Sequence, residues 1–281
     1  MRRSDAATIA RSVPSLELMR RAAQGIFDAC RWPGHTAIVA GSGNNGGDGY
    51  ALAEILHDHG MDASIHMVSE KTSEDGRHYL ERARAKGIPI SIFDPQDDVL
   101  RNADTIADCL LGTGFHGVPR QNVADAIRFI NASDARVVSA DINSGLDGET
   151  GLAEMAVESD LTVSIGYLKD GMFLNRAGDF IGRLVNVDIG IELEREENLV
   201  VGDDEFEDML GECGAAQVRF AEDVDGAGPD GPGGGPASPV ERVEKLASEL
   251  GCSIWVSGNV TEYLATADKV VFRKPGWLDF D

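Results

Sequence analysis

The chain is poor in the residues that hold nucleic acids or anionic membranes. It contains only six lysines in 281 residues, and its 25 basic residues stand against 48 acidic ones, which gives a net charge of −23. A chain this negative repels phosphate backbones and anionic lipid surfaces, so we expect neither nucleic acid nor a membrane as a partner. The acidic, lysine-poor composition fits adaptation to high salt, and plain solubility accounts for it equally well.

Cysteines and long apolar runs are also scarce. The four cysteines, Cys30, Cys109, Cys213 and Cys252, are widely spaced and form no C-x-x-C pair, which is typical of a reduced compartment. No run of 18 apolar residues occurs, and the first residues lack the apolar segment of a secretory leader. We therefore expect a soluble, cytoplasmic protein.

Apolar segments that read as strands alternate with helical patterns over the first two thirds of the chain. The predicted strands are 36–40, 63–68, 89–93, 105–107, 136–140, 161–165 and 184–187. The predicted helices are 15–27, 51–59, 76–85 and 122–131. Such alternation indicates βαβ units and a mostly parallel sheet. The predicted fold is therefore α/β, a Rossmann-like three-layer α/β/α arrangement.

Beyond residue 195 the composition changes. Residues 196–239 are acidic at first and then rich in glycine and proline, most strongly at 226–236, so we predict a linker there. The last segment, 240–281, contains one helical pattern and short strands, which is too little for an independent core. The predicted organisation is a domain at 1–195, an acidic linker and a small C-terminal appendage.

The densest motif is Gly-Ser-Gly-Asn-Asn-Gly-Gly-Asp-Gly at 41–49, directly after an apolar strand pattern and before a helical one. Glycines let the backbone approach a ligand closely, and a helix N-terminus favours an anion such as phosphate. Gly41, Gly43 and Gly46 formally fit the dinucleotide fingerprint, yet Glu70 is the one acid near the end of the second strand. An ordinary dehydrogenase is therefore disfavoured, while a simple tight turn stays an alternative.

Three polar, glycine-containing segments follow predicted strands: 44–48, 108–117 and 140–151. In parallel sheets, ligands bind beyond the carboxyl ends of the strands. We therefore predict that the three segments form one pocket.

Together with Pro14-Ser15-Leu16-Glu17-Leu18-Met19 and the segment 182–190, these motifs resemble the NAD(P)H-hydrate epimerases, which form the N-terminal module of bacterial bifunctional NAD(P)H-hydrate repair enzymes. The resemblance runs from about Asp5 to Ile191. It implies an isomerase that interconverts the R and S forms of hydrated NADH or NADPH at carbon 6 of the nicotinamide ring. It also implies a homodimer and functional coupling to a separate dehydratase.

The resemblance further implies a set of site residues. The substrate would be bound by Asn44, Asn45, Gly46, Gly47, Asp48, Gly112, Thr113, Gly114, Phe115, His116, Gly117, Val118 and Asp141. A potassium ion would be held by Asn45, Asp108 and Ser144, whose oxygens are the hard ligands that such cations prefer. For Asp108 and Asp141, a purely structural role in capping a loop is the alternative.

Inversion at carbon 6 needs a group that donates and accepts a proton. The candidates are Lys169 paired with Asp188, which could share a proton, and His116, because histidine is a residue type able to exchange a proton near neutral pH. A structural salt bridge or a surface position is the alternative for each. Two residues depart from the pattern of the resembling family: His116 itself, and Asn143 where proline is common.

Other readings stay open. Similar domains also serve as non-catalytic binding or scaffold modules. No basic pair for a 2′-phosphate is identifiable in the sequence. Residues 243–274 faintly resemble a fragment of the dehydratase module, but they lack its glycine-rich nucleotide loop, so we expect no dehydratase activity.

Overall fold

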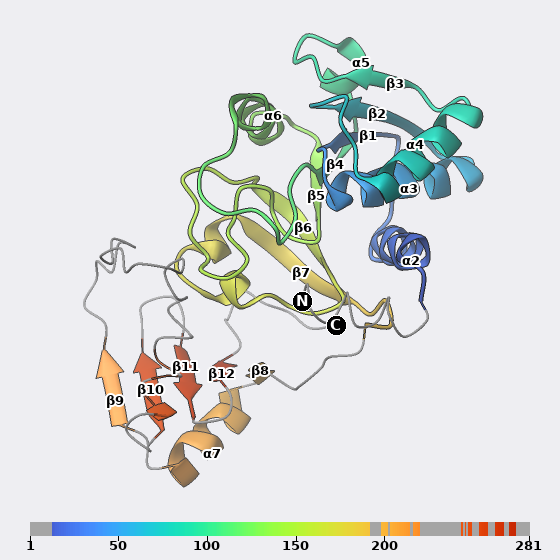
Figure 1. Cartoon of the computed structure of the whole chain (residues 1–281). Coiled ribbons are helices and arrows are strands. Elements are labelled where there is room, and N and C mark those ends of the chain that lie inside the picture. The colour runs from blue at the N-terminus through green and yellow to red at the C-terminus, as the bar shows by residue number, and fades with distance from the viewer. Residues whose placement is uncertain are drawn as a thin grey trace, which may run out of the picture.

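The computed structural model describes residues 13–191, 198–201, 203–213, 216–219, 253–257, 262–266 and 270–273, together with 243, 245, 247 and 248. Its main feature is a seven-stranded sheet in the order β3-β2-β1-β4-β5-β6-β7 (Figure 1). Every neighbouring pair in it is parallel. The strands are β1 (His35–Ala40), β2 (Asp62–Met67), β3 (Ile90–Ile92), β4 (Thr105–Cys109), β5 (Arg136–Ala140), β6 (Ser159–Ile165) and β7 (Ile181–Val187).

Helices cover both faces of this sheet, which confirms the predicted three-layer fold. They are α2 (Ser15–Asp28), α3 (Asn44–Asp58), α4 (Glu74–Ala85), α5 (Asp98–Arg101) and α6 (Gln121–Asn131), with short 3-10 turns η1 (Asp170–Phe173) and η2 (Ala177–Asp179). Alternate residues of β1 point to opposite faces. Ile38 and Ala40 pack in a core with α2, α3 and α4, whereas Ala37 and Val39 pack in a core with α5 and α6.

The helix α3 begins seven residues earlier than the sequence predicted. We expected a loop at residues 44–48, but Asn44–Asp48 is the first turn of α3, with Gly43 at the N-cap position. Glycine has a low helix propensity, so local preference concealed this start. The tertiary packing of Gly46 and Gly47, described below, explains why the helix forms there.

The C-terminal region forms a second sheet, in the order β8-β12-β11-β10-β9. Its elements are β8 (Asn198–Val201), α7 (Asp203–Cys213), β9 (Ala216–Arg219), β10 (Ile254–Ser257), β11 (Glu262–Ala265) and β12 (Val270–Arg273). Residues 198–219 had been predicted to lie in the linker, and this part of the prediction is corrected. The acidic residues of α7 hid an amphipathic helix, whose fully buried Phe206 packs against Leu264 and Val271. The glycine- and proline-rich segment 226–236 lies outside the described residues.

The second sheet shares a hydrophobic core with the main domain. Phe272 of β12 lies against Phe173 of η1, with ring centroids 5.6 Å apart. The same cluster contains Ile142 and Leu146, which follow β5. The appendage therefore packs on the segments that surround the end of β5 rather than standing apart.

Two further features concern the cysteines and the helices. Cys30 and Cys109 are free thiols, and burial raises the pKa of both. Within the described residues, no helix combines the length and apolar character needed to cross a bilayer.

Candidate functional site

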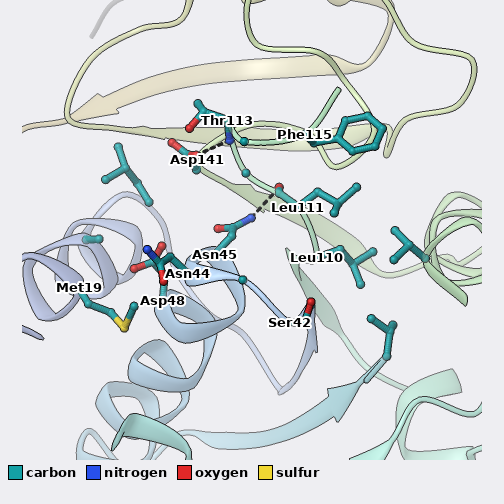
Figure 2. A pocket seen from close by; sticks show the side chains of 18 of the residues that line it. Met19, Ser42, Asn44, Asn45, Asp48, Leu110, Leu111, Thr113, Phe115 and Asp141 are labelled. Atoms are coloured by element: carbon teal, nitrogen blue, oxygen red, sulfur yellow. Dashed lines mark hydrogen bonds between the residues drawn. The ribbon is translucent and has the colours of Figure 1, made fainter. Parts of the chain in front are cut away.

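A cavity of about 820 Å³ opens at the carboxyl ends of the parallel strands (Figure 2). Its walls come from α2, from the segments that follow β1, β2, β4 and β5, and from Ile165, Ile189 and Ile191 at the end of β6 and after β7. Strand β2 lies on one side of β1 and β4 lies on the other, so the strand order reverses at β1. The cavity is at this reversal point, which is where parallel α/β sheets bind ligands. The volume suits a small-molecule ligand.

Ten of the thirteen predicted substrate-binding residues line this cavity. They are Asn44, Asn45, Asp48, Gly112, Thr113, Gly114, Phe115, His116, Val118 and Asp141. The other three, Gly46, Gly47 and Gly117, are not in its wall. The structure therefore brings the three predicted segments together around one cavity, and these three glycines do not contact it.

The glycines at the start of α3 are needed for close packing. A methyl group on Gly46 would lie 2.1 Å from the carbonyl oxygen of Gly41, and one on Gly47 would lie 2.5 Å from Cε of Met19. A methyl group on Gly43 would meet nothing within 4 Å. Gly46 and Gly47 thus hold the helix against its surroundings, while Gly43 faces the cavity, where the free N–H groups of α3 favour an anion.

Asn45 joins three elements and has one buried atom without a partner. Its Nδ2 donates to the carbonyl oxygen of Leu111 at 2.8 Å and to that of Ala140 at 3.2 Å, and the first of these bonds is drawn in Figure 2. Its Oδ1 is buried and accepts no hydrogen bond. An unsatisfied buried oxygen is costly, so it marks a place for a donor or a cation.

Asp108 and Ser144, the other two predicted potassium ligands, are in direct contact. The carboxylate of Asp108 accepts from the hydroxyl of Ser144 at 2.5 Å and from its N–H at 2.9 Å, and also from Ser139 and the N–H of Leu110. Burial nevertheless raises the pKa of Asp108. Ser144 Oγ lies 3.2 Å from the carbonyl oxygen of Leu111, which Asn45 also contacts. Asn45 and Ser144 therefore both contact the carbonyl oxygen of Leu111, and Asp108 is joined to this pair through Ser144.

Asp141 is held at the cavity wall by two donors and has an uncommon backbone conformation. It has φ of 68°, a left-handed conformation that residues other than glycine adopt rarely and that recurs at functional sites. Its Oδ1 lies 2.6 Å from Nζ of Lys169, and its Oδ2 accepts from the N–H of Thr113 at 3.0 Å, as Figure 2 shows for the latter. Lys169 also donates to Ser164 Oγ and to the carbonyl oxygen of Ile165.

The predicted pairing of Lys169 with Asp188 is not found. Asp188 is exposed, is absent from the cavity wall, and accepts a hydrogen bond from the N–H of Gly190 at 2.7 Å. Strand β7, which precedes it, is at the edge of the sheet, whereas β5 and β6 are neighbours and place Asp141 next to Lys169. The partner of Lys169 is therefore Asp141.

His116 lies in the cavity wall and is oriented by a carboxylate that the sequence analysis did not single out. Its Nδ1 lies 2.8 Å from Oδ2 of Asp147. Burial alone would raise the pKa of Asp147, but hydrogen bonds from His116 and from the N–H groups of Glu149 and Thr150 lower it overall. Because the carboxylate accepts only, the proton of a neutral His116 resides on Nδ1, and Nε2 is left for a ligand.

Asn143, which departs from the pattern of the resembling family, is fully buried in a polar network. Its Nδ2 contacts the carbonyl oxygens of Val157 and Phe180, and its Oδ1 accepts from Thr162. The loop after β5 is thus fastened to β6 without a proline.

Comparison with known proteins identifies the family of this chain. Residues 15–171, more than half of the chain, match the family described as YjeF-related protein N-terminus. The chain belongs to this family. An NAD(P)H-hydrate epimerase of Limosilactobacillus fermentum is 34% identical over 195 residues, which cover 67% of this chain and 93% of that protein.

Other similar proteins are longer or more distant. A bifunctional NAD(P)H-hydrate repair enzyme of Archaeoglobus fulgidus is 38% identical over 207 residues, and the match covers 73% of this chain but 40% of that protein. The chain thus spans less than half of this bifunctional relative. A yeast protein, YNL200c, has a crystal structure with a TM-score of 0.50 at 20% identity, over 58% of this chain and 74% of that one, which supports the fold.

Proposed function

We propose that this YjeF-family chain is an NAD(P)H-hydrate epimerase. The observation that carries the proposal is the cavity at the reversal point of the sheet, where an anion-favouring helix start shares one wall with His116 and Asp141. Relatives named NAD(P)H-hydrate epimerase, which this chain matches over most of their length, support the same activity.

The reaction we propose is reversible loss of the hydroxyl group from carbon 6. An acid donates a proton to the hydroxyl, the C–O bond breaks, and water leaves while the lone pair of the ring nitrogen forms a C=N bond. The resulting iminium is planar at carbon 6. Water then adds to either face of carbon 6 and returns a proton to the base. Addition to the face opposite the one that lost water inverts the configuration at carbon 6, and the water released and the proton donated in the first step are both restored.

His116 is our choice for the acid and base. Asp147 keeps the Nδ1 proton in place and stabilises the imidazolium, so Nε2 accepts a proton when the ring is neutral and donates one when it is charged. The side chain is 50% exposed and lines the cavity, so a ligand can reach it.

Asp141 and Lys169 act as a pair in this proposal. The carboxylate of Asp141 lines the cavity and would stabilise the positive charge of the iminium. Lys169 has three acceptors for its three N–H groups and is buried, so it is a positioning residue that acts through Asp141 rather than an acid. Asp188, which is exposed and lies outside the cavity wall, is not part of the proposed reaction.

We also propose that potassium binds at Asn45, Asp108 and Ser144. The buried, unpaired Oδ1 of Asn45 supports this, as does the all-oxygen character of the set. When bound, the ion would offset the charge of Asp108 and of a pyrophosphate near the start of α3.

Potassium should therefore raise the melting temperature above that in sodium or choline salts of equal ionic strength, since a ligand of the folded state stabilises it. Asn45→Ala should remove the difference between the salts, whatever its effect on absolute stability. Asn122→Ala, which removes an exposed amide elsewhere in the cavity wall, should keep it. Equal melting temperatures in all three salts for the unaltered protein would refute the potassium site.

The activity itself is tested with a mixture of both hydrate epimers and a stereospecific dehydratase that consumes only the S form. The protein should accelerate consumption of the R form, and His116→Gln should reduce that rate by about 100-fold, the usual contribution of a general acid or base. Arg128→Gln, on the outer face of α6, is the matched control. No acceleration by the unaltered protein would leave the cavity as a binding site and favour the non-catalytic module.

The substrate and partners follow from the same proposal. Relatives that are named bifunctional repair enzymes support coupling to a dehydratase, which would act on the S form. The homodimer and the cytoplasmic location stay predictions from the sequence.

A further inference from the structure

The end of β2 presents a cation to the cavity instead of an acid. Ser69 and Lys71 line the cavity, whereas Glu70, the acid that the sequence offered for a ribose hydroxyl, does not. An acid at this place is what binds the 2′-hydroxyl of NAD in Rossmann folds, and a basic residue nearby accommodates the 2′-phosphate of NADP. The exposed side chain of Lys71 is therefore informative about the ligand.

A second cation, Arg120, lines the same cavity, although it is 49 positions from Lys71 in the sequence. Asn122, at the start of α6, donates through Nδ2 to the carbonyl oxygen of Val68 at 2.8 Å, which ties this helix to the end of β2. Arg120 stands two residues before Asn122, at the N-cap position of α6, and it also lines the cavity. The hydrogen bond explains why the two basic residues flank one part of the wall.

The charges in this part of the wall favour an anion. Neither Lys71 nor Arg120 forms an ion pair in the part of the chain that the structure describes, and Asp75 is the carboxylate that accompanies them in the wall after β2. The other carboxylates of the cavity wall, Asp48 and Asp141, belong to the segments after β1 and β5, so the two cations outnumber the carboxylate in the wall that the segments after β2 and β4 form. A phosphate group matches both, since arginine binds it through a fork and lysine as a point charge.

The order of the strands indicates which end of a bound dinucleotide lies at which strand. Asp141 and His116 follow β5 and β4, so the reacting ring belongs on that side, and the pyrophosphate belongs at the start of α3 after β1. The adenosine end then extends to β2, on the opposite side of β1. We propose that Lys71 and Arg120 bind the 2′-phosphate of the adenosine ribose and select hydrated NADPH over hydrated NADH. This inference rests on the proposed function.

Binding of two fragments tests the phosphate site without catalysis. Adenosine 2′,5′-bisphosphate should bind about tenfold more tightly than adenosine 5′-monophosphate in calorimetry at low salt, the size of one charged hydrogen bond. Lys71→Ala and Arg120→Ala should each bring the two affinities close to equality. Arg77→Ala, which removes the same charge from the outer side of α4, should keep the tenfold ratio. Equal affinities in the unaltered protein, or a ratio that survives both variants, would overturn the inference.

Kinetics then separate the two proposals. If the fragments bind as expected but no epimer is consumed, the 2′-phosphate site stands and the proposed activity fails. If both hydrates are turned over with the same kcat/KM, and the variants leave that equality unchanged, the activity stands and the selection of NADPH fails. In the expected case, Lys71→Ala raises KM for the NADPH hydrate about tenfold and leaves KM for the NADH hydrate unchanged.

Discussion

Replacing Asp141 by asparagine is expected to abolish epimerisation and to lower the free energy of unfolding by about 3 kcal/mol or more, the usual cost of breaking a buried ion pair. The ammonium of Lys169, which is 7% exposed, would keep its charge and lose its counter-ion. The new amide also cannot satisfy both neighbours. If its oxygen accepts from Lys169, its NH₂ group faces the N–H of Thr113.

Urea unfolding of three variants checks this. Asp141→Asn should be strongly destabilised, and the double variant Asp141→Asn, Lys169→Met should recover most of the loss because the unpaired charge is gone, yet it should stay inactive. Asp188→Asn is the matched control, since that carboxylate is exposed; it should change stability by no more than about 0.5 kcal/mol and leave the rate intact. A stable Asp141→Asn, or an active double variant, would contradict the role given to the pair.

The second large effect is expected at Gly46. An alanine methyl group there would lie 2.1 Å from the backbone oxygen of Gly41, which cannot rotate away as a side chain could. We expect Gly46→Ala to cost about 3 kcal/mol or more, at or above the upper range of overpacking, or to prevent folding. Gly43→Ala should cost at most about 1 kcal/mol, because the site is open and only a favourable N-cap residue is lost.

Thermal unfolding compares the two glycine variants directly. The pair is informative because both residues belong to the same motif and only Gly43 faces the cavity. Gly43→Ala should therefore fold normally and weaken nucleotide binding, while Gly46→Ala fails before binding can be tested. Similar melting temperatures for the two variants would mean that the loop relaxes, and the packing argument would be wrong.

The sequence was sufficient for the fold and for the location of the cavity. Periodicity gave the seven strands of the main sheet, and polar segments after β1, β4 and β5 indicated which edge binds a ligand. The partner of Lys169 could not be read in this way. Both Asp141 and Asp188 follow a strand, and only the adjacency of β5 and β6, together with the positive φ of Asp141, decides between them.

Other parts of the site depend on contacts between distant segments. The cations Lys71 and Arg120 line one cavity, and the hydrogen bond from Asn122 joins the start of α6 to the end of β2. No local sequence pattern carries that information. The second sheet was missed because two of its strands, β8 and β9, lie in a stretch whose charge suggested a solvated linker. Composition describes the average charge and polarity of a segment. The pairing of β9 with β10 and of β8 with β12 depends instead on a few apolar positions.

The shared core of the two sheets makes substitutions in one sheet depend on the other. Ile142 follows Asp141, Leu146 precedes Asp147, and both pack in the cluster that contains Phe272. A change of volume in the tail is therefore transmitted to the residues that flank both carboxylates, since close-packed cores pass strain on. The tail and the reaction centre must consequently accept substitutions together, and the tail cannot drift as freely as a segment joined by a passive tether.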